Sequence, residues 1–375
     1  MFKNCKYRIY PNKSQIKIIK QNIDTSRFVY NYYLNKRITA YKNDDQKLST
    51  YDCMNDLSKL KKLDQYSWLR LADSQALLQS LMSLDIAYTQ FFNRIKKKNK
   101  NVKFGFPKFK RKKKCKWSYK TTNTGNIKIA DNFISLRKLG KVKIKIDRSL
   151  SNDCKIKSAV ITRTRLDKYF VSVLVECDND KPFECTGKNV GIDLGLKHFI
   201  ITSEGLKISN PKYFVKSQNK LAKLQRELSR KTRGSSNYNK AQYKIAKLSE
   251  HVANQRNDFL QKLSTSIVKQ YDTICTENLN VEGLLKNHKL AKSISDVSWS
   301  MFISMLNYKC DWYNKQLVKV DRFFPSTKTC NVCGYVNQDL TLKDRNWICP
   351  NCNTNLDRDI NAAINILNEG LKRKA

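Results

Sequence analysis

Apolar side chains in the first third of the chain recur mostly at helical spacing. Residues 3–10 come first and are typical of a short strand. In residues 15–41, apolar positions follow at roughly helical intervals, at Ile16, Ile19, Ile23, Phe28 and Leu34. Residues 74–95 predict a second long helix, which runs into a basic segment. Gly105 and Pro107 break the helical pattern there.

The apolar pattern changes to a period of two in the next part of the chain. Residues 141–147 alternate strictly, with one apolar face formed by Val142, Ile144 and Ile146. Residues 158–176 predict a hairpin that turns near Leu166 and Asp167. We therefore expect a small β-barrel or sandwich that takes residues 3–10 as its first strand and carries the helical segment as an insert.

The second half of the chain alternates between strands and helices after a linker at residues 178–188. We expect three short strands within 188–210, helices at 215–232 and 239–271, a fourth strand at 272–278, a helix at 298–317, a strand at 318–325, and a terminal helix from Asp359 to about Asn368. This alternation is typical of an α/β domain.

The charge balance indicates a polyanionic partner. The chain has 375 residues and 40% apolar residues, enough for two or three domains of roughly 150 residues each. Its 73 Lys and Arg against 32 Asp and Glu give a net charge of +41, which favours nucleic acid as the partner. A basic protein of the membrane surface is the alternative. No apolar stretch reaches the roughly 18 residues of a spanning helix, and the N-terminus has no apolar signal core, so we expect a cytoplasmic protein.

Four of the twelve cysteines form two close pairs. Cys330 and Cys333, then Cys349 and Cys352, are separated by a spacer of 15 residues. This spacing predicts a tetrahedral thiolate site for structural Zn²⁺, because four thiolates leave no open coordination position. A redox dithiol pair and a free-standing nucleic-acid-binding ribbon are the alternatives. The remaining cysteines are isolated and indicate reduced cytosolic thiols: Cys5, Cys53, Cys115, Cys154, Cys177, Cys185, Cys275 and Cys310.

Three acids in separate segments form the candidate catalytic set. Asp193 lies in an apolar strand, Glu277 ends the strand at 272–278, and Asp359 begins the terminal helix. Alone, each has an ordinary explanation: a strand-end residue, a turn residue and a helix N-terminal acid. Together they can bind Mg²⁺, and two such ions roughly 3.5–4 Å apart support cleavage of a phosphodiester. Asp357 is the alternative to Asp359 at the third position, or it contacts Asp359 without binding the metal itself.

These residues, in this order, resemble the TnpB family, insertion-sequence-encoded (OrfB-type transposase accessory) proteins related to type V CRISPR effectors. The segments that carry the resemblance are YPNKSQ, SRFVYNYYLNKR, FGFPKFK, VGIDLGLKHF, ICTENL, FFPSTKTCNVCG and DRDINAAIN. The resemblance covers almost the whole chain. It implies a multidomain α/β fold, with a wedge β-barrel (residues 1–12 and 103–180) interrupted by an α-helical recognition domain (13–102). It also implies a ribonuclease H-like RuvC nuclease domain (186–375) with an inserted four-cysteine zinc ribbon (325–357).

The function implied by the resemblance is an Mg²⁺-dependent, RNA-guided DNA endonuclease. It would use a guide RNA from the element's own end and cleave double-stranded DNA beside a short target-adjacent motif. The match makes Asp193, Glu277 and Asp359 the catalytic, Mg²⁺-binding acids, with no departure from the family pattern at these positions. We expect a monomer on its RNA. Neither the adjacent motif, the guide sequence nor the cut positions follow from the sequence.

Nucleic-acid contacts are expected where phenylalanines alternate with lysines and where the family reads DNA. Such a segment can contact phosphates and stack bases, although a solvated basic linker is the alternative. The candidate residues are Tyr51, Lys103, Phe106, Lys108, Lys110, Arg111, Thr122 and Asn123. Two other functions remain open: a nucleic-acid-binding regulator that does not cut, and a transposase that cuts and joins DNA. The three acids argue against the regulator, but they do not exclude strand transfer.

Overall fold

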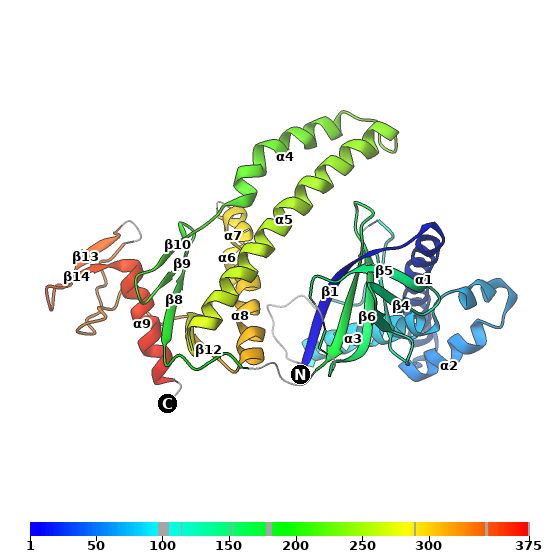
Figure 1. The fold of residues 1–375 in the computed structure, drawn as a ribbon, viewed down its shortest axis with the longest axis horizontal. Coiled ribbons are helices and arrows are strands. Elements are labelled where there is room, and N and C mark those ends of the chain that lie inside the picture. Colours follow the sequence, from blue (N-terminus) through cyan, green and yellow to red (C-terminus); the bar gives the residue numbers. More distant parts are fainter. Residues whose placement is uncertain are drawn as a thin grey trace. The chain divides into compact units, whose positions relative to one another are not determined.

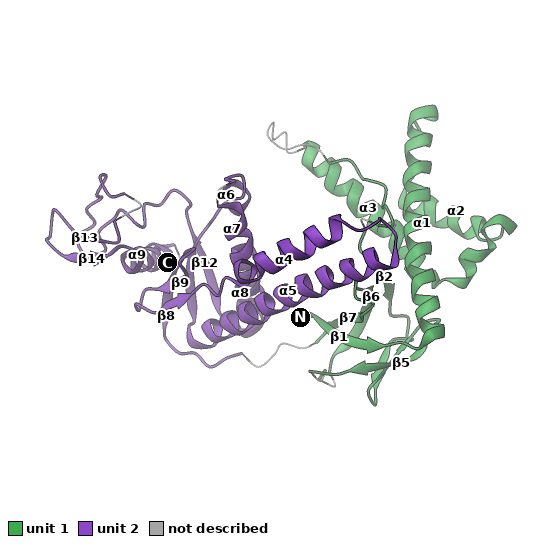
Figure 2. Ribbon diagram, turned by 90° about the horizontal axis from the view of Figure 1, so that it is seen from above, with its two compact units in different colours: residues 1–178 green, residues 179–375 purple. Residues whose placement is uncertain are grey.

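The computed structural model describes residues 1–96, 105–113, 115–148, 150–151, 153–177, 182–288, 290–341 and 344–373. The chain divides into two compact units, residues 1–178 and 179–375 (Figure 2). Each unit has hydrophobic cores of its own.

Unit 1 contains a curled antiparallel sheet of seven strands in the order β2-β6-β7-β1-β5-β4-β3. The strands are β1 (Phe2–Tyr10), β2 (Ser118–Thr122), β3 (Lys128–Ala130), β4 (Phe133–Leu136), β5 (Gly140–Lys145), β6 (Lys155–Arg163) and β7 (Tyr169–Glu176). Alternate residues of β7 are buried, which is the period of two that the sequence predicts. As expected, the first segment of the chain supplies a strand of this sheet, β1, which lies between β7 and β5 (Figure 1).

The helices of unit 1 lie in sequence between β1 and β2. They are α1 (Lys13–Asp44), α2 (Thr50–Leu60), the 3₁₀ helix η1 (Asp64–Leu71) and α3 (Ser74–Lys96). A capping box starts α1, in which the side chains of Asn12 and Gln15 bond each other's backbone N–H groups. The apolar faces of these helices form a second core that includes Tyr33, Leu57 and Leu81.

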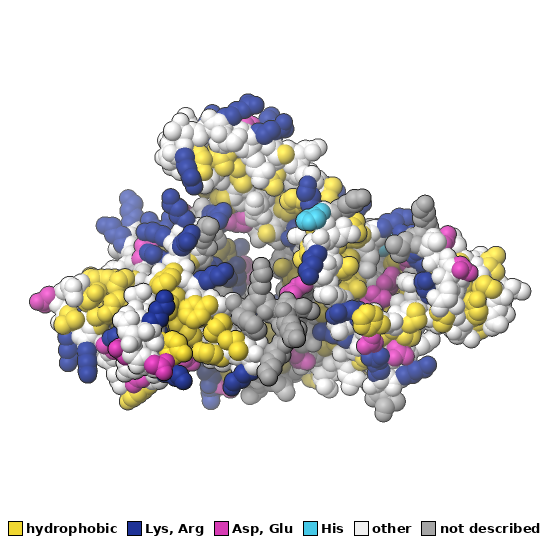
Figure 3. Space-filling view, turned by 180° about the vertical axis from the view of Figure 1, so that it is seen from behind, with side chains coloured by type: hydrophobic (Ala, Val, Ile, Leu, Met, Phe, Trp, Pro, Cys, Tyr) yellow, Lys and Arg dark blue, Asp and Glu magenta, His cyan; other side chains and the backbone are white. Residues whose placement is uncertain are grey.

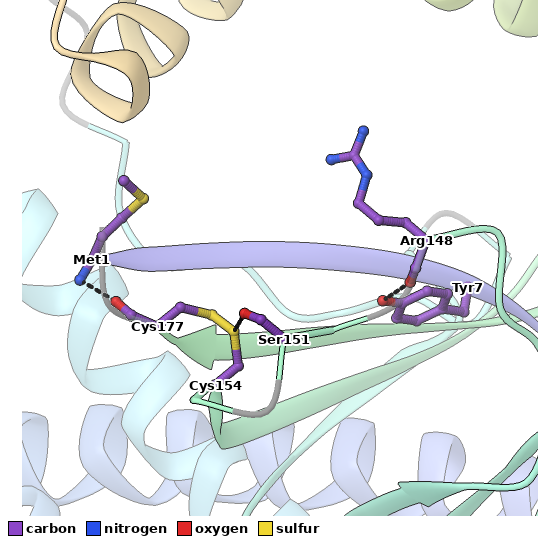
Figure 4. Close-up of a disulfide and its surroundings, with 6 residues drawn as sticks. All are labelled: Met1, Tyr7, Arg148, Ser151, Cys154 and Cys177. Atoms are coloured by element: carbon purple, nitrogen blue, oxygen red, sulfur yellow. Dashed lines mark hydrogen bonds between the residues drawn. A yellow bond between two sulfur atoms is a disulfide. The ribbon is translucent and has the colours of Figure 1, made fainter. Parts of the chain in front are cut away.

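One expectation about the cysteines is wrong. Cys154 and Cys177, predicted to be isolated thiols, form a disulfide with a Cα–Cα distance of 4.2 Å (Figure 4). The reason is the hairpin register, because Lys155 of β6 pairs with Glu176 of β7 and the next residues outward are the two cysteines. The N-terminal amine also donates a 2.8 Å hydrogen bond to the Cys177 carbonyl, which ties three chain segments together.

Unit 2 contains a mixed sheet of five strands in the order β10-β9-β8-β11-β12. The strands are β8 (Asn189–Leu194), β9 (His198–Thr202), β10 (Lys207–Ser209), β11 (Thr273–Glu277) and β12 (Gln316–Val320). The first three are antiparallel neighbours, whereas β11 and β12 run parallel to β8. Three antiparallel strands followed by two parallel strands in this order form the sheet of ribonuclease H, as expected.

Helices cover both faces of this sheet. The helices of unit 2 are α4 (Tyr213–Ser229), α5 (Ser236–Gln270), α6 (Val281–Leu284), α7 (Ala291–Val297), α8 (Trp299–Tyr313) and α9 (Arg358–Lys372). One face packs on α5 and α8, and the other face packs on α9 (Figure 1). The strand predicted at 318–325 is instead β12, because Asn314 adopts a left-handed conformation and ends α8 early.

The segment before α9 folds as a small ribbon around the paired cysteines. It contains β13 (Asn346–Ile348) and β14 (Asn355–Asp357), which pair in antiparallel fashion. Trp347 and Leu356 pack with Cys330 and Cys349 in its core. Over the parts of the chain that the structure describes, no helix combines the length and apolarity needed to span a membrane.

Candidate active site and metal centre

Two of the three candidate acids lie at the carboxyl ends of neighbouring parallel strands, Asp193 one residue before the end of β8 and Glu277 at the end of β11. In the ladder between β8 and β11, Ile192 lies opposite Thr276. Asp193 and Glu277 are the next residue on each strand, so they lie side by side at the carboxyl edge of the sheet. Ligands in open α/β sheets bind at this edge.

Helix α9 brings the third acid to the same edge because two glycines let it lie directly on the sheet. A Cβ at Gly191 would lie 2.0 Å from the Ala363 carbonyl oxygen, and one at Gly370 would meet the Cys275 sulfur. From Gly191 to Asp193 the strand advances about 6.6 Å. From Ala363 back to Asp359 the helix advances about 6 Å, so Asp193 and Asp359 lie at similar distances from the contact between Gly191 and Ala363.

The three carboxylates share one electrostatic environment. Burial, followed by the negative charges of Glu277 and Asp359, raises the pKa of the Asp193 carboxyl to about 7. The same repulsion would be relieved by a divalent cation among the three acids. The donor set therefore fits a hard cation such as Mg²⁺, which prefers oxygen ligands.

Asp359 is paired with two arginines in this structure. Nη1 of Arg345 lies 3.2 Å from both of its carboxylate oxygens, and Nη2 of Arg358 lies 3.5 Å from one of them. Arg345 comes from the cysteine ribbon and its side chain is 54% exposed. The ribbon thus supplies a positive charge to the acidic site, at a position that solvent reaches.

Asp357 has a different task from Asp359. Its carboxylate caps α9 by accepting hydrogen bonds from the backbone N–H groups of Asp359 and Ile360, both at 3.1 Å. It also forms a 2.5 Å ion pair with Lys207. Burial raises the pKa of the Asp357 carboxyl. The hydrogen bonds from Lys207 and from the backbone N–H groups at the helix N-terminus outweigh burial, so the pKa lies below its ordinary value. Asp357 therefore caps the helix, and Asp359 remains the third candidate acid.

A groove leads away from Glu277 along α8. Its volume is approximately 450 Å³. The polar side chains that line it are small or flexible, and they are Asn278, Ser300, Ser304, Asn307 and Lys319. Such a groove has room for part of an extended chain of nucleotides beside the acids.

The four paired cysteines converge in the ribbon. The Sγ atoms of Cys330 and Cys352 are 3.7 Å apart, and those of Cys333 and Cys349 are 3.6 Å apart. Sulfurs at about 2.3 Å from a tetrahedral zinc ion would be about 3.8 Å apart, so the set fits Zn²⁺. Among the residues with described positions, this is the group of Cys, His, Asp or Glu ligand atoms compact enough for one ion. The three carboxylates are not such a group, and two ions about 3.5–4 Å apart need a wider site.

Positive charge is widely spread. Figure 3 shows Lys and Arg side chains distributed over the visible face and not gathered in one patch. Of the residues predicted to contact nucleic acid, four are exposed: Tyr51, Phe106, Lys108 and Arg111. Lys103 lies outside the described residues.

The other three predicted contact residues have partners within unit 1. Nζ of Lys110 lies 3.6 Å from the ring centre of Tyr30. Thr122 donates a 2.7 Å hydrogen bond to the Gln75 side chain. The Asn123 amide donates to the Ile156 carbonyl at 2.9 Å and accepts from the Ile127 backbone at 2.9 Å, so it fastens a turn of the sheet.

Sequence reasoning missed three polar residues around the acids. Ser326 donates a 2.8 Å hydrogen bond to Glu277, Arg345 pairs with Asp359, and Lys207 pairs with Asp357. Ser326 lies inside a signature segment of the family, so its segment was visible but its role was not. Arg345 and Lys207 carried no signal among so many basic residues.

The fold and these sites define a class: a ribonuclease H-like domain joined to a four-cysteine ribbon and preceded by a unit of sheet and helices. Three family models match parts of the chain. A model described as "Probable transposase" matches residues 172–288, a "Cas12f1-like, TNB domain" model matches 299–366, and a "Helix-turn-helix domain" model matches 1–47. In the structure, this last segment forms β1 and the single helix α1.

Relatives identify the family. A protein of Streptomyces pristinaespiralis is 37% identical over 371 residues, which cover 99% of this chain and 90% of the relative. InsQ of Escherichia coli (strain K12) is 27% identical over 380 residues, with 97% and 91% covered. Both are named "Putative RNA-guided DNA endonuclease". The chain belongs to this family, the TnpB family.

A solved structure shares the fold. The protein in the cryo-EM structure of a Cas12f1-sgRNA-target DNA complex superimposes with a TM-score of 0.60 and 13% identity, covering 98% of both chains. At this identity the likeness concerns the fold alone. The predicted fold class, a multidomain α/β protein with a RuvC-like domain and a four-cysteine ribbon, is confirmed.

Proposed function

We propose that this protein is an RNA-guided endonuclease that cleaves double-stranded DNA beside a short target-adjacent motif. The observation that carries the proposal is the meeting of Asp193, Glu277 and Asp359 at the carboxyl edge of a ribonuclease H sheet. The names of the relatives and the RNA and DNA in the Cas12f1 complex support the substrate class.

The three acids would hold two Mg²⁺ ions and act as the catalytic residues. Bound cations would activate the attacking water and stabilise the leaving 3′ oxygen as the phosphorus–oxygen bond breaks. Asp193 contributes an ionised carboxylate only after losing the proton that its surroundings favour. The groove beside Glu277 would receive the strand to be cut.

Guide RNA would come from the end of the mobile element that encodes the protein. The net charge of +41 suits a heteroduplex held by its phosphates, with sequence read by base pairing. Residues 1–12 and 103–180 would form the wedge domain, 13–102 the recognition domain and 186–375 the nuclease domain. Tyr51, Lys103, Phe106, Lys108, Lys110, Arg111, Thr122 and Asn123 would contact nucleic acid.

The ribbon at residues 325–357 would bind structural Zn²⁺ through Cys330, Cys333, Cys349 and Cys352. Its position supports this task, because the ribbon connects β12 to α9 and supplies Arg345 to the acids. We place the protein in the bacterial cytoplasm, where its DNA target lies, and expect it to act as a monomer on its RNA.

One experiment tests whether cleavage is guided. The protein is purified from cells that carry its mobile element, and the RNA that accompanies it is sequenced. The complex is then given Mg²⁺ and a plasmid library with a matching target beside random flanks. We expect one defined RNA from the end of the element, and linear plasmids that share a short flanking motif.

Asp193→Ala and a control identify the active site. Asp193→Ala should retain the RNA and lose cleavage, whereas Asp131→Asn, which removes an exposed acid in unit 1, should change neither. A random RNA mixture without cleavage would favour a binding regulator. Joined DNA products would favour a strand-transfer transposase.

A further inference from the structure

Glu277 is held by a serine from the segment that leads into the cysteine ribbon. The hydroxyl of Ser326 donates a 2.8 Å hydrogen bond to Oε1 of Glu277. Ser326 is 4% exposed, so water does not readily replace its hydroxyl. We propose that Ser326 is a positioning residue of the nuclease, which fixes the Glu277 carboxylate so that its second oxygen faces the cation site. The inference rests on the function proposed above.

Ser326 is itself anchored to α9. Asn365 is 5% exposed, and its side-chain amide donates to the carbonyls of Ser326 and Thr329 at 2.8 and 2.6 Å. Asn361, one turn earlier, is 1% exposed and donates to the Thr329 carbonyl at 2.7 Å. It also accepts from the Asn331 backbone N–H at 2.9 Å.

These contacts form a hydrogen-bond network beside the acidic site. Helix α9 carries Asp359 near its start, and Asn361 and Asn365 lie two and six residues further along it. The asparagines hold the segment 326–331, and Ser326 of that segment holds Glu277 on β11. The relative position of two acids from distant parts of the chain is thus set by hydrogen bonds as well as by packing.

The chemistry of the contact favours this role over simple filling of space. A hydroxyl that donates to an ionised carboxylate forms a charge-assisted bond, which is shorter and stronger than a neutral one. It orients one oxygen and leaves the lone pairs of the other for a cation. Groups that orient metal ligands in this way typically contribute about 10- to 100-fold in metal affinity or activity.

The hydrogen-bond network also includes the beginning of the ribbon. Cys330 lies between Thr329 and Asn331, both of which are bonded to Asn361. The ribbon therefore does more than stabilise the fold at a distance from the acids. Its first cysteine belongs to the segment that orients Glu277.

The test compares Ser326→Ala and Ser326→Thr with Ser264→Ala. Ser264 is also a buried, hydrogen-bonded serine: it is 0% exposed on α5, and its hydroxyl accepts a 2.7 Å hydrogen bond from Nζ of Lys309 on α8. For each RNA-bound protein we would measure the cleavage rate against Mg²⁺ concentration, Mn²⁺ binding by electron paramagnetic resonance, zinc content and the unfolding temperature.

We expect Ser326→Ala to keep its zinc, RNA and target binding while Mn²⁺ affinity and cleavage fall by about 10- to 100-fold. A higher Mg²⁺ concentration should recover part of the rate. Ser326→Thr, which keeps the hydroxyl, should restore most of it, and Ser264→Ala should cut with the Mg²⁺ dependence of the unaltered protein. Asn365→Ala, which frees the segment but keeps the hydroxyl, should shift the Mg²⁺ requirement in the same direction as Ser326→Ala.

Two results would overturn the inference even if the nuclease proposal holds. In the first, Ser326→Ala cuts and binds Mn²⁺ like the unaltered protein, which would mean that Ser326 orients nothing while the nuclease proposal still stands. In the second, the loss of activity in Ser326→Ala matches a loss of zinc or of folded protein, with no rescue by threonine. If the unaltered protein neither cuts nor binds Mn²⁺, the nuclease proposal fails and this inference fails with it.

Discussion

Gly191 of β8 and Ala363 of α9 approach so closely that a Cβ on the glycine would lie 2.0 Å from the alanine carbonyl oxygen. The atoms in the way are backbone, and a Cβ would also lie 2.7 Å from the Leu367 nitrogen, so α9 as a whole has to move before a side chain fits. This contact sets the position of Asp359 along the sheet relative to Asp193.

The first prediction is that Gly191→Ala displaces α9 and separates the acids. Overpacking of this kind costs about 1–3 kcal/mol, and the misplaced carboxylates should lower cleavage more strongly than stability. Thermal unfolding and cleavage rates measure the two effects. Gly105→Ala is the control, because its Cβ would meet only the Arg94 side chain, at 3.4 Å. Cleavage by Gly191→Ala at the rate of the unaltered protein would show that α9 does not set the site.

The second prediction concerns pH and Asp193. Because its pKa is raised to about 7 in the folded protein, unfolding releases a proton between about pH 4 and pH 7. This carboxyl therefore makes the Mg²⁺-free protein less stable as the pH rises through that range. Asp193→Asn does not titrate, so its unfolding temperature should exceed that of the unaltered protein above pH 7 and match it near pH 4.

The measurement is thermal unfolding of zinc-loaded protein in Mg²⁺-free buffer without chelator, because a chelator would also remove zinc. Added Mg²⁺ should stabilise the unaltered protein at pH 8 and not Asp193→Asn. A stabilisation by asparagine that is the same at every pH would disprove the assigned repulsion among the acids.

The third prediction concerns the ion pair between Arg345 and Asp359. A bound cation competes with the exposed guanidinium for the same carboxylate. Exposed ion pairs contribute about 0.2–1 kcal/mol, so Arg345→Gln should tighten Mn²⁺ binding by about 1.4- to 5-fold. Titration followed by electron paramagnetic resonance gives the affinity, with Arg226→Gln on α4 as the control. Weaker Mn²⁺ binding by Arg345→Gln would mean that the arginine assists the cation instead of competing with it.

The fourth prediction is that Cys349→Ser removes zinc and destabilises the ribbon. A thiolate site contributes its metal-binding free energy to folding, so losing one ligand should lower the unfolding temperature of unit 2 and expose residues 326–357 to proteolysis. Zinc analysis and limited proteolysis test this. Cys115→Ser, at a free cysteine in unit 1, should leave both unchanged. A full zinc content in Cys349→Ser would contradict the four-thiolate assignment.

Local patterns predicted most of the fold. The period-two segments became β5, β6 and β7, and the alternation in the second half became the sheet and helices of unit 2. The pairing of Cys154 with Cys177 was within reach, because Cys154 lies 12 residues before Leu166 and Cys177 lies 10 residues after Asp167, at similar distances from the predicted hairpin turn. It was missed because isolated cysteines were read without the register of the strands beside them.

The sequence could not predict the contacts of the site that depend on the folded structure. Asp357 and Asp359 are two residues apart and chemically alike, and only the hydrogen bonds at the start of α9 separate the cap from the candidate ligand. Ser326 and Glu277 are 49 residues apart, and a single serine in a loop carries no periodic signal. The arginine that meets Asp359 could not be chosen among 73 basic residues.

The most direct test of the central claim compares three isosteric variants, Asp193→Asn, Glu277→Gln and Asp359→Asn, in RNA-bound form on a matched target. Mn²⁺ binding and cleavage are measured on the same samples. The account predicts that the unaltered protein binds Mn²⁺ and cuts, and that each variant keeps its RNA and its target but loses both Mn²⁺ binding and cutting. Three variants that bind Mn²⁺ and cut like the unaltered protein would contradict it.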